Sequence, residues 1–534
     1  MCEIGSACST PDARDAGHHL AVGPGVLAIV HTAATFGIDA YPVDVEVDVS
    51  DGGLPAVTMV GLPDASVRES RERVQSAVRN SGFAFPQRRV TVNLSPADIR
   101  KVGGAFDLPI AIGVLCGAGL LPLRYLEGTL VLGELSLDGA VRPVRGTLPI
   151  AVRARREGVR AIVLPAANAS EASIVSGLDI VSVTSLHETV AILTGDRSTT
   201  RQPSPPTTGS DRLRAESVPD LADVKGQALA RRALEIAAAG GHNLLFVGPP
   251  GAGKSMLARR LPGILPPLTT DEALETTAIH SVAGLLPPDA GLLRQAPFRA
   301  PHHTTSGIAL VGGGSLPRPG EISLAHNGVL LLDETAEFPR HVLEALRQPL
   351  EEGTIRIARA MRTAVFPARF MLVAAMNPCP CGFQGDDRRP CRCTPQAIDR
   401  YRGRLSGPLR DRLDLSVWVP AVPFTVIAKA APGESSIPVR QRVSKARERQ
   451  WARHRSGEAG PANARLEGLA LTRSCLLDAR GLAILEAASR RFHLSARSCH
   501  RLLKVARTIA DLAGTDQIGV DHLAEAVQFR LQDA

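Results

Sequence analysis

Hydrophobic and polar positions alternate strictly over residues 43–49 of this chain, and residues 88–94 are a second candidate for the same pattern. A period of two residues is typical of half-buried β-strands. Two further stretches, residues 66–81 and 108–120, place their apolar side chains at helical spacing. This mixture predicts an α+β domain of its own over residues 25–196.

The middle of the chain has a second pattern, in which short apolar runs alternate with helical ones. A helix predicted over residues 226–239 leads into an apolar strand at 243–247, and further apolar strands follow at 328–332 and 369–375. Strands that alternate with helices favour a parallel sheet covered by helices on both faces. We therefore predict an α/β domain over residues 218–425.

Only helical spacing remains from residue 439 onward. The predicted helices cover residues 439–455, 482–492, 496–513 and 520–531. They indicate a helical lid over residues 426–534. Residues 197–217 are rich in Pro, Ser, Thr and Arg and predict a linker, while residues 1–24 form an N-terminal extension.

The charge balance permits a polyanionic partner. The 534 residues include 61 Lys and Arg against 53 Asp and Glu, a formal charge of +8. Many basic proteins nevertheless bind no nucleic acid, so charge alone leaves both outcomes open. Aromatic residues make up only 3% of the chain. Contacts to phosphates, more than base stacking, would therefore supply affinity for a single strand.

Composition also predicts the compartment. No stretch reaches the ~20 apolar residues that span a bilayer, and the first 20 residues lack the basic start and apolar core of a secretory signal. We expect a cytoplasmic protein with no membrane contact. The nine cysteines then predict thiols or metal ligands and not a disulfide framework.

A phosphate-binding motif of the form G-x-x-x-x-G-K-[ST] directly follows the strand at 243–247. It reads Gly248-Pro249-Pro250-Gly251-Ala252-Gly253-Lys254-Ser255, and a helix is predicted after it over residues 256–261. The glycines let successive backbone N–H groups turn toward one anion, Lys254 supplies charge for the outer phosphates, and the Ser255 hydroxyl can ligate Mg²⁺. These residues predict binding of ATP with Mg²⁺.

Acidic and amide side chains follow the next two apolar strands. Asp333 and Glu334 end the run at 328–332, where Asp333 can orient Mg²⁺ and Glu334 can polarise the attacking water. Asn377 follows the strand at 369–375, and it would lie beside the acidic pair if the two strands are neighbours. Together with Lys254, these residues predict an ATPase.

Four cysteines form two close pairs, C-x-C-x₉-C-x-C. They are Cys379, Cys381, Cys391 and Cys393. Two thiolate pairs joined by a short loop suit tetrahedral Zn²⁺, so we predict a structural zinc site. Reduced cysteines in a polar insertion are the alternative.

The chain is identified by its motifs as a member of the AAA+ ATPases, in the magnesium-chelatase-like branch and within it the ComM (YifB) family. The motifs are GPPGAGKS, PHHTTSGIALVGGGSLPRPGEISLAHNGVLLLDE, AAMNPCPCG and RYRGRLSGPLRDRLD. The likeness extends from about residue 25 to residue 531. It implies a P-loop AAA+ core with a helical lid and assembly into a homo-oligomeric ring, a hexamer.

The same resemblance assigns roles to individual residues. It implies Asp333 and Glu334 as Walker B, Asn377 as sensor 1, Arg412 as an arginine finger and Arg497 as sensor 2, with Arg501 as the competing choice for sensor 2. An arginine finger stabilises charge on the transferred phosphoryl group. If Arg412 acts on the nucleotide of a neighbouring subunit, hydrolysis depends on assembly. The alternative is a surface arginine paired with Asp411 or Asp414.

Two segments are candidates for contact with a substrate. Residues 353–365 predict a β-hairpin that resembles the pre-sensor hairpin of this branch, and Arg356, Arg359 and Arg362 could meet phosphates there or pair with Glu351 and Glu352. Residues 301–321 resemble the helix-2 insert of the same branch. Their two histidines, His302 and His303, are possible metal ligands, but we expect a mobile loop there.

The first domain is similar to the Lon-protease fold. A peptidase of that type needs a serine nucleophile and a lysine base, and the matching segments 104–108 and 145–150 contain neither. We expect an inactive scaffold or a platform for nucleic acid. Six basic residues of this domain could contact DNA or could simply form solvated surface: Arg68, Arg71, Arg73, Arg88, Arg89 and Lys101.

These features together predict an ATP-dependent AAA+ motor that moves on single-stranded or branched DNA. It resembles the ComM-type helicase that promotes branch migration in homologous recombination and DNA uptake. The alternative is a magnesium-chelatase-like ATPase that remodels a protein partner for metal insertion. A third class, the ATP-dependent peptidase, is disfavoured by the absent serine and lysine.

Overall fold

The computed structural model describes residues 27–50, 54–98, 101–195, 218–287, 290–314, 317–358, 362–423, 428, 431–455 and 462–530. The predicted extension 1–24 and the whole of the predicted linker 197–217 lie outside these ranges, as does Arg359. The chain divides into two compact units. Within the described residues, the first unit holds 27–32, 43–142 and 183–195, and the second holds 33–42, 143–182 and everything from residue 218 onward.

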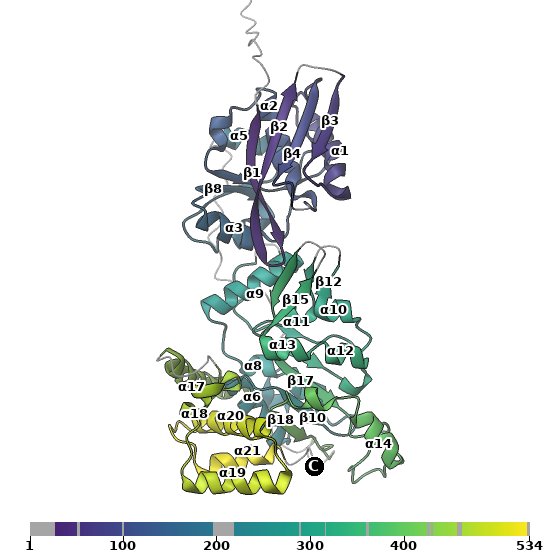
Figure 1. Cartoon of the computed structure of the whole chain (residues 1–534), viewed down its shortest axis with the longest axis vertical. Coiled ribbons are helices and arrows are strands. Elements are labelled where there is room, and N and C mark those ends of the chain that lie inside the picture. The colour runs from purple at the N-terminus through teal and green to yellow at the C-terminus, as the bar shows by residue number, and fades with distance from the viewer. Residues whose placement is uncertain are drawn as a thin grey trace, which may run out of the picture. The chain divides into compact units, whose positions relative to one another are not determined.

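A seven-stranded sheet dominates the residues before 196 (Figure 1). Its order is β3-β4-β2-β1-β5-β8-β9. The strands are β1 (Ala28–Phe36), β2 (Asp39–Ser50), β3 (Ala56–Val60), β4 (Arg89–Ser95), β5 (Thr129–Val131), β8 (Ala161–Pro165) and β9 (Asp179–Val183). The two strands that alternation predicts are confirmed as β2 and β4. They pair antiparallel with Val47 opposite Val92, and their alternate side chains are buried.

The helices of this region follow the predicted apolar spacing. The predicted helices are confirmed as α1 (Ala65–Asn80) and α2 (Asp107–Gly117), and α3 (Thr147–Arg156), α4 (Ala169–Ala172) and α5 (Leu186–Leu193) add to them. The side chain of Asp64 caps α1 by accepting the Val67 N–H at 2.8 Å. A small hairpin joins β6 (Glu134–Leu135) to β7 (Val141–Arg142).

Two of the basic residues proposed for DNA contact in this region have partners within the protein. Arg73 Nε donates to Asp107 Oδ2 at 2.8 Å, and the Asp107 side chain is fully buried. Lys101 is also fully buried and its Nζ donates to the carbonyl of Pro96. The prediction is therefore wrong for Lys101, because a fully buried cation that pairs within the protein cannot reach a phosphate. The side chain of Arg73 is 24% exposed, so its contact with DNA stays a prediction.

A second sheet of five parallel strands organises the residues from 218 onward, in the order β11-β14-β17-β10-β18. Its strands are β10 (Leu244–Val247), β11 (Phe298–Arg299), β14 (Val329–Leu332), β17 (Met371–Met376) and β18 (Leu415–Trp418). All four neighbouring pairs are parallel, which confirms the predicted P-loop α/β fold. Because β17 lies between β10 and β14, three predicted functional segments end at one edge of the sheet.

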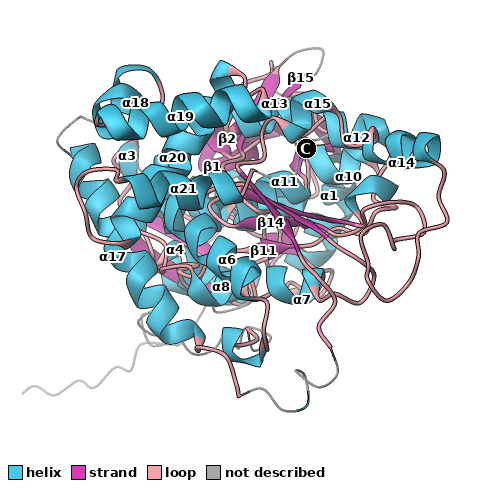
Figure 2. Ribbon diagram, turned by 90° about the horizontal axis from the view of Figure 1, so that it is seen from below, coloured by secondary structure: helices cyan, strands magenta, loops and turns pink. Residues whose placement is uncertain are grey.

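Both faces of this sheet are covered, which explains its continuous apolar runs. Alternate residues of β14 enter different cores: Val329 and Leu331 join one cluster, Leu330 and Leu332 the other. Figure 2 shows the helices around these strands. They are α6 (Ala228–Gly240), α7 (Lys254–Ala258), α8 (Leu261–Ile264), α9 (Thr270–Ala283), α10 (Gly307–Val311), α11 (Glu321–Leu324), α12 (Arg340–Glu344), α13 (Arg347–Glu352), α14 (Pro395–Arg402) and α15 (Gly407–Arg410).

The helix predicted over residues 256–261 is in fact two short ones. Helix α7 begins two residues earlier, at Lys254, and ends at Ala258, and α8 begins at Leu261. Pro262 lies in the first turn of α8, where its missing N–H is tolerated. The same proline could not continue α7, which accounts for the break.

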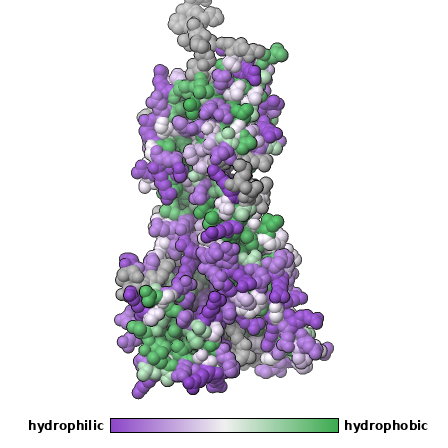
Figure 3. Space-filling model, in the orientation of Figure 1, coloured by the Kyte–Doolittle hydropathy of each residue, from purple (hydrophilic) through white to green (hydrophobic). Residues whose placement is uncertain are grey.

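The predicted C-terminal helices are confirmed, with small changes at their ends. They are α17 (Ser436–Arg455), α19 (Ala479–Phe492), α20 (Ala496–Leu512) and α21 (Val520–Gln528), and α18 (Gly468–Ser474) is added to them. Helices α17 and α20 share one core with α6 of the sheet domain. Leu469, Leu476 and Leu482 are exposed in this region, and Figure 3 shows apolar surface over the C-terminal helices.

A buried carboxylate ties these helices together. Asp511 on α20 is 2% exposed and accepts hydrogen bonds from Arg453 Nη2 of α17 at 2.5 Å and from Asn463 Nδ2 at 2.8 Å. Arg507 lies 3.1 Å from its other oxygen. The buried Arg507 and the partly exposed Arg453 therefore share one carboxylate.

Replacing Asp511 by Asn should lower the free energy of unfolding by about 3–5 kcal/mol, because the variant removes the negative charge that pairs with the buried Arg507. Urea unfolding of the full chain, followed by tryptophan fluorescence, measures this. The matched control is Asp516→Asn, which removes a carboxylate that is 95% exposed and pairs with Arg449, and should cost under about 1 kcal/mol. Equal midpoints for the two variants would contradict this account.

Candidate nucleotide-binding site

The phosphate-binding motif forms the turn between β10 and α7. Gly251 and Gly253 have φ angles of +74° and +92°, a conformation that a residue with a side chain rarely adopts. Such turns point successive N–H groups into one concavity, which favours an anion. The predicted cradle is therefore present in the backbone.

Lys254 lies inside this turn and holds it closed. Its Nζ donates to the carbonyls of Gly248 at 2.7 Å and Pro249 at 3.0 Å, and to Asn377 Oδ1 at 3.0 Å. Burial lowers the pKa of Lys254 to about 8, while Asp333 and Glu334 act in the opposite direction. An incoming phosphate would restore the preference for the charged form.

Ser255 and Asp333 lie in direct contact. Ser255 Oγ donates to Asp333 Oδ2 at 2.5 Å. Hydroxyl and carboxylate oxygens are the ligands that Mg²⁺ takes beside a nucleotide. The structure thus brings Lys254, Ser255, Asp333 and Asn377 together at the carboxyl edge of the sheet, as the strand order requires.

Glu334 has an unusual backbone and an unexpected partner. Its φ angle is +49°, and its own N–H is held by Asp333 Oδ1 at 2.9 Å. Its Oε2 lies 3.3 Å from Nδ1 of His303, which stacks on His302 with ring centroids 4.1 Å apart. Left-handed conformations of this kind gather at functional sites because surrounding contacts enforce them.

His303 is a site residue that the sequence analysis did not assign. It follows β11, which pairs in parallel with β14, so the segment after β11 emerges at the same edge as Glu334. The approach of His303 to Glu334 follows from the strand order, and it cannot be predicted from the spacing of residues along the chain. The two histidines belong to this contact, and among the described residues the potential metal ligands cluster elsewhere.

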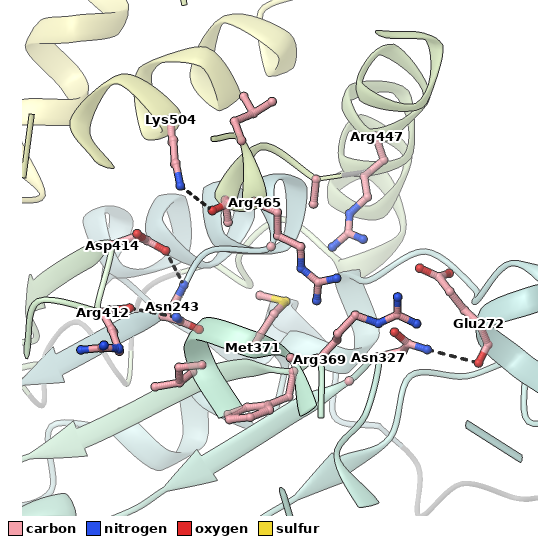
Figure 4. Close-up of a pocket in the computed structure, with 18 of the residues that line it drawn as sticks. Asn243, Glu272, Asn327, Arg369, Met371, Arg412, Asp414, Arg447, Arg465 and Lys504 are labelled. Atoms are coloured by element: carbon pink, nitrogen blue, oxygen red, sulfur yellow. Dashed lines mark hydrogen bonds between the residues drawn. The ribbon is translucent and has the colours of Figure 1, made fainter. Parts of the chain in front are cut away.

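A large cavity lies at the opposite edge of the same sheet. Its volume is about 950 Å³, and it is lined by residues that precede the strands, among them Asn243 before β10, Gly328 before β14 and Asp414 before β18 (Figure 4). The amino ends of parallel strands lie away from their carboxyl ends by the length of the strand. The cavity is therefore separate from the turn that holds Lys254.

Arg412, Arg497 and Arg501 all line this cavity at the amino edge. The structure does not bring them to Lys254 within one chain. Arg412 pairs with Glu351, and not with Asp411 or Asp414 as one alternative supposed, while Arg501 Nη2 is 3.2 Å from Asp411 Oδ1.

Three further arginines of the cavity were not anticipated. Arg369, Arg447 and Arg465 lie around one part of it (Figure 4). Burial, together with the neighbouring Arg369 and Arg447, lowers the pKa of Arg465 to about 10. The three arginines come from separate segments, so no local motif could have grouped them.

The predicted hairpin is confirmed as β15 (Thr354–Ala358) and β16 (Thr363–Pro367), which pair antiparallel with Arg356 opposite Val365. Ile355, Ile357 and Phe366 face the core, whereas Arg356 is exposed and lies 3.9 Å from Glu352. The hairpin therefore presents Arg356 to the exterior.

The four predicted zinc ligands come together. The sulfur atoms of Cys379, Cys381, Cys391 and Cys393 all lie within 4.8 Å of one another. This arrangement is compatible with a structural zinc site.

Comparison with known proteins decides the family. Models described as "Magnesium chelatase, subunit ChlI", "Subunit ChlI of Mg-chelatase" and "Magnesium chelatase, subunit ChlI C-terminal" match residues 220–427, 45–168 and 433–530. The chain is 47% identical over 509 residues to the protein YifB of Escherichia coli K12, covering 95% of this chain and 97% of YifB. It is 47% identical over 507 residues to the competence protein ComM of Haemophilus influenzae, and the match covers 94% of this chain and 97% of ComM.

The chain belongs to the magnesium-chelatase-like ComM/YifB family. A more distant relative is the magnesium-chelatase 38 kDa subunit of Rhodobacter capsulatus, 26% identical over 314 residues, which span 54% of this chain and 79% of that subunit. Family membership suggests ATP hydrolysis with Mg²⁺ and assembly into oligomeric rings. None of the described helices is both long and apolar enough to cross a membrane.

The pKa of Lys254 predicts a pH dependence for nucleotide binding. Below about pH 8, Lys254 of the free protein is already protonated and charged. Above that pH, Lys254 is mostly neutral and must take up a proton when ATP binds. Affinity for ATP should therefore fall about tenfold between pH 7 and pH 9. Calorimetric titration at pH 7, 8 and 9 measures it.

The matched control is Lys254→Arg, because a guanidinium stays charged over this range. Its affinity should not vary with pH in the same way. A wild-type affinity that is constant up to pH 9 would contradict the assigned role of Lys254.

Proposed function

We propose that this protein is an ATP-hydrolysing ring motor that acts on DNA. The observation that carries the proposal is the convergence of Lys254, Ser255, Asp333 and Asn377 at one edge of a parallel sheet. A phosphate cradle, two oxygen ligands and a positioned amide are the parts that phosphoryl transfer to water requires. Their placement supports ATPase activity more directly than it supports any particular polymer substrate.

Each residue has a defined task in this proposal. The glycine turn and Lys254 bind the phosphates, and Ser255 with Asp333 would hold Mg²⁺, which neutralises charge on the phosphate oxygens when bound. Glu334 polarises the attacking water, and Asn377 orients it. His303 holds the Glu334 carboxylate at 3.3 Å and is a positioning residue.

The arginines at the opposite edge complete the site of a neighbouring chain. Arg412 and Arg497 line the cavity at the amino ends of the strands, so neither serves the Lys254 of its own chain. A head-to-tail interface, in which the amino edge of one subunit meets the carboxyl edge of the next, generates a closed ring. In this proposal the ring is a hexamer, and hydrolysis requires it.

The proposed substrate is single-stranded or branched DNA, moved during branch migration in homologous recombination and DNA uptake. The exposed Arg356 of the hairpin and the excess of Lys and Arg support contact with phosphates. A relative that is 47% identical over most of the chain is named a competence protein, which agrees with a role in DNA uptake. We place the motor in the cytoplasm.

We also propose domain limits and a role for the first region. The proposed domains are a Lon-protease-like scaffold at 25–196, an AAA+ core at 218–425 and a lid at 426–534. In the segments that match a peptidase centre, Asp107 is buried and paired with Arg73. This pairing supports a structural role over acyl transfer.

The second candidate is a chelatase-type motor that remodels a protein partner for metal insertion. It is favoured by the three family models, which all describe a magnesium-chelatase subunit. The 38 kDa chelatase relative is, however, matched over only 54% of this chain.

Measuring ATP turnover alone and with single-stranded or branched DNA tests the proposal. We expect DNA to stimulate turnover and branched substrates to be unwound, and Glu334→Gln to lower turnover by about 10²-fold or more while ATP still binds. Stimulation without unwinding would reduce the role to loading or remodelling of DNA. No stimulation by any DNA would contradict the DNA motor and favour the chelatase-type motor.

A further inference from the structure

Four cysteine sulfur atoms lie at the corners of a small polyhedron beside the nucleotide site. The separations are 3.4 Å for Cys379 to Cys381, 3.7 Å for Cys379 to Cys391 and 3.6 Å for Cys381 to Cys391. Four sulfurs bound to Zn²⁺ at ~2.3 Å in a tetrahedron lie ~3.8 Å apart. The observed spacing is close to that value and far from the ~2.05 Å of a disulfide.

Backbone groups support negative charge on these sulfurs. The N–H of Cys381 donates to Cys393 Sγ at 3.4 Å, and the N–H of Cys393 donates to Cys391 Sγ at 3.4 Å. Arg389 and Arg392 are exposed on the connecting loop, where Arg388 pairs with Asp386. Because all-sulfur tetrahedral sites select Zn²⁺ or iron–sulfur centres, and a single ion fits this spacing, the chemistry favours zinc.

The cluster is mechanically joined to the nucleotide site. Cys379 is fully buried and comes two residues after Asn377, the amide that contacts Lys254. Gly382 donates its N–H to the carbonyl of Cys379 at 2.9 Å. At φ +83° it packs so closely on the phosphate-binding turn that a Cβ there would lie 2.6 Å from Cδ of Pro250. The segment from Cys379 to Gly382 therefore follows the end of β17 and packs on the phosphate-binding turn at Pro250.

We propose that Cys379, Cys381, Cys391 and Cys393 bind one Zn²⁺ ion, and that this metal clip holds Asn377 and Pro250 in the positions that ATP hydrolysis requires. The ion is structural and does not meet the nucleotide. The second half of the statement rests on the proposed ATPase function. The first half stands on the cysteine geometry alone.

Metal analysis of the full-length protein, purified without chelators, tests the site. We expect about one zinc per chain in the wild type and a loss in Cys391→Ser and Cys393→Ser. The matched control is Cys499→Ser, which removes a partly exposed free thiol of α20 outside the cluster and should retain zinc. Protein reconstituted with Co²⁺ should show the sulfur-to-metal charge-transfer and intense d–d bands of a tetrahedral thiolate site.

Fewer than about one zinc per four chains in the wild type, or iron in its place, would overturn the assignment. So would a zinc content in Cys391→Ser that equals that of the control. Circular dichroism of each variant shows whether the fold is retained, and the Co²⁺ spectrum of the wild type decides the question even if a serine variant fails to fold.

Two variants separate metal binding from the positioning it provides. Cys391→Ser should lose zinc and lose about tenfold in kcat, since a displacement near 1 Å has an effect of that order or larger, while ATP still binds. Gly382→Ala should keep its zinc and still lose kcat, because the new methyl group pushes on Pro250. If Cys391→Ser lacks zinc but turns over ATP like the wild type, the coupling is wrong and the ATPase stands. If the wild type holds zinc but hydrolyses nothing, the ATPase proposal fails and the metal site stands.

Discussion

Parallel pairing of five short strands is the constraint on which the candidate site depends. In a parallel sheet every carboxyl end lies at one edge and every amino end at the other. The segments proposed to bind phosphate, metal and water follow strands at the carboxyl edge, whereas Arg412, which precedes β18, and Arg497, on α20, line the cavity at the amino edge. In the proposed ring, one chain carries two different halves of a catalytic site on opposite edges, and a second chain joins them.

The two edges are also rigidly connected. Asn243 directly precedes β10, the strand that ends at the phosphate turn. Its side chain donates to the carbonyl of Arg412 at 2.8 Å and accepts the N–H of Leu372 at 2.8 Å. Strand β10 between them has four residues, a length of about 13 Å. A displacement of the nucleotide turn thus reaches the arginine loop through a short, buried strand, and not through flexible linkers. In the proposed ring, this connection provides a physical route from the nucleotide of one subunit to that of the next.

The sequence predicted the strands and site residues that depend on neighbours along the chain. It did not predict the contacts that depend on which strands pair with one another. The run Val329–Leu332 followed by Asp333 predicts a buried strand with a carboxylate at its end, because burial on both faces requires a continuous apolar run. His303 could not be assigned in the same way, since its approach to Glu334 depends on β11 lying beside β14. The position of Arg412 likewise depends on strand order, and its partner Glu351 is 61 residues away. The two helices α7 and α8 show the remaining type of error, where one proline divides a predicted element.

Mixing two inactive variants tests the central claim most directly. Glu334→Gln removes the water-polarising group at the carboxyl edge, and Arg412→Ala removes the arginine at the amino edge. If one edge of each chain completes the site of the next, a mixture contains interfaces that combine an intact Glu334 from one chain with an intact Arg412 from the other. In a randomly mixed ring this occurs at about a quarter of the interfaces, so the mixture should hydrolyse ATP well above the sum of its components. A mixture that assembles but stays as inactive as each variant alone would show that both residues serve the same chain, which contradicts the account.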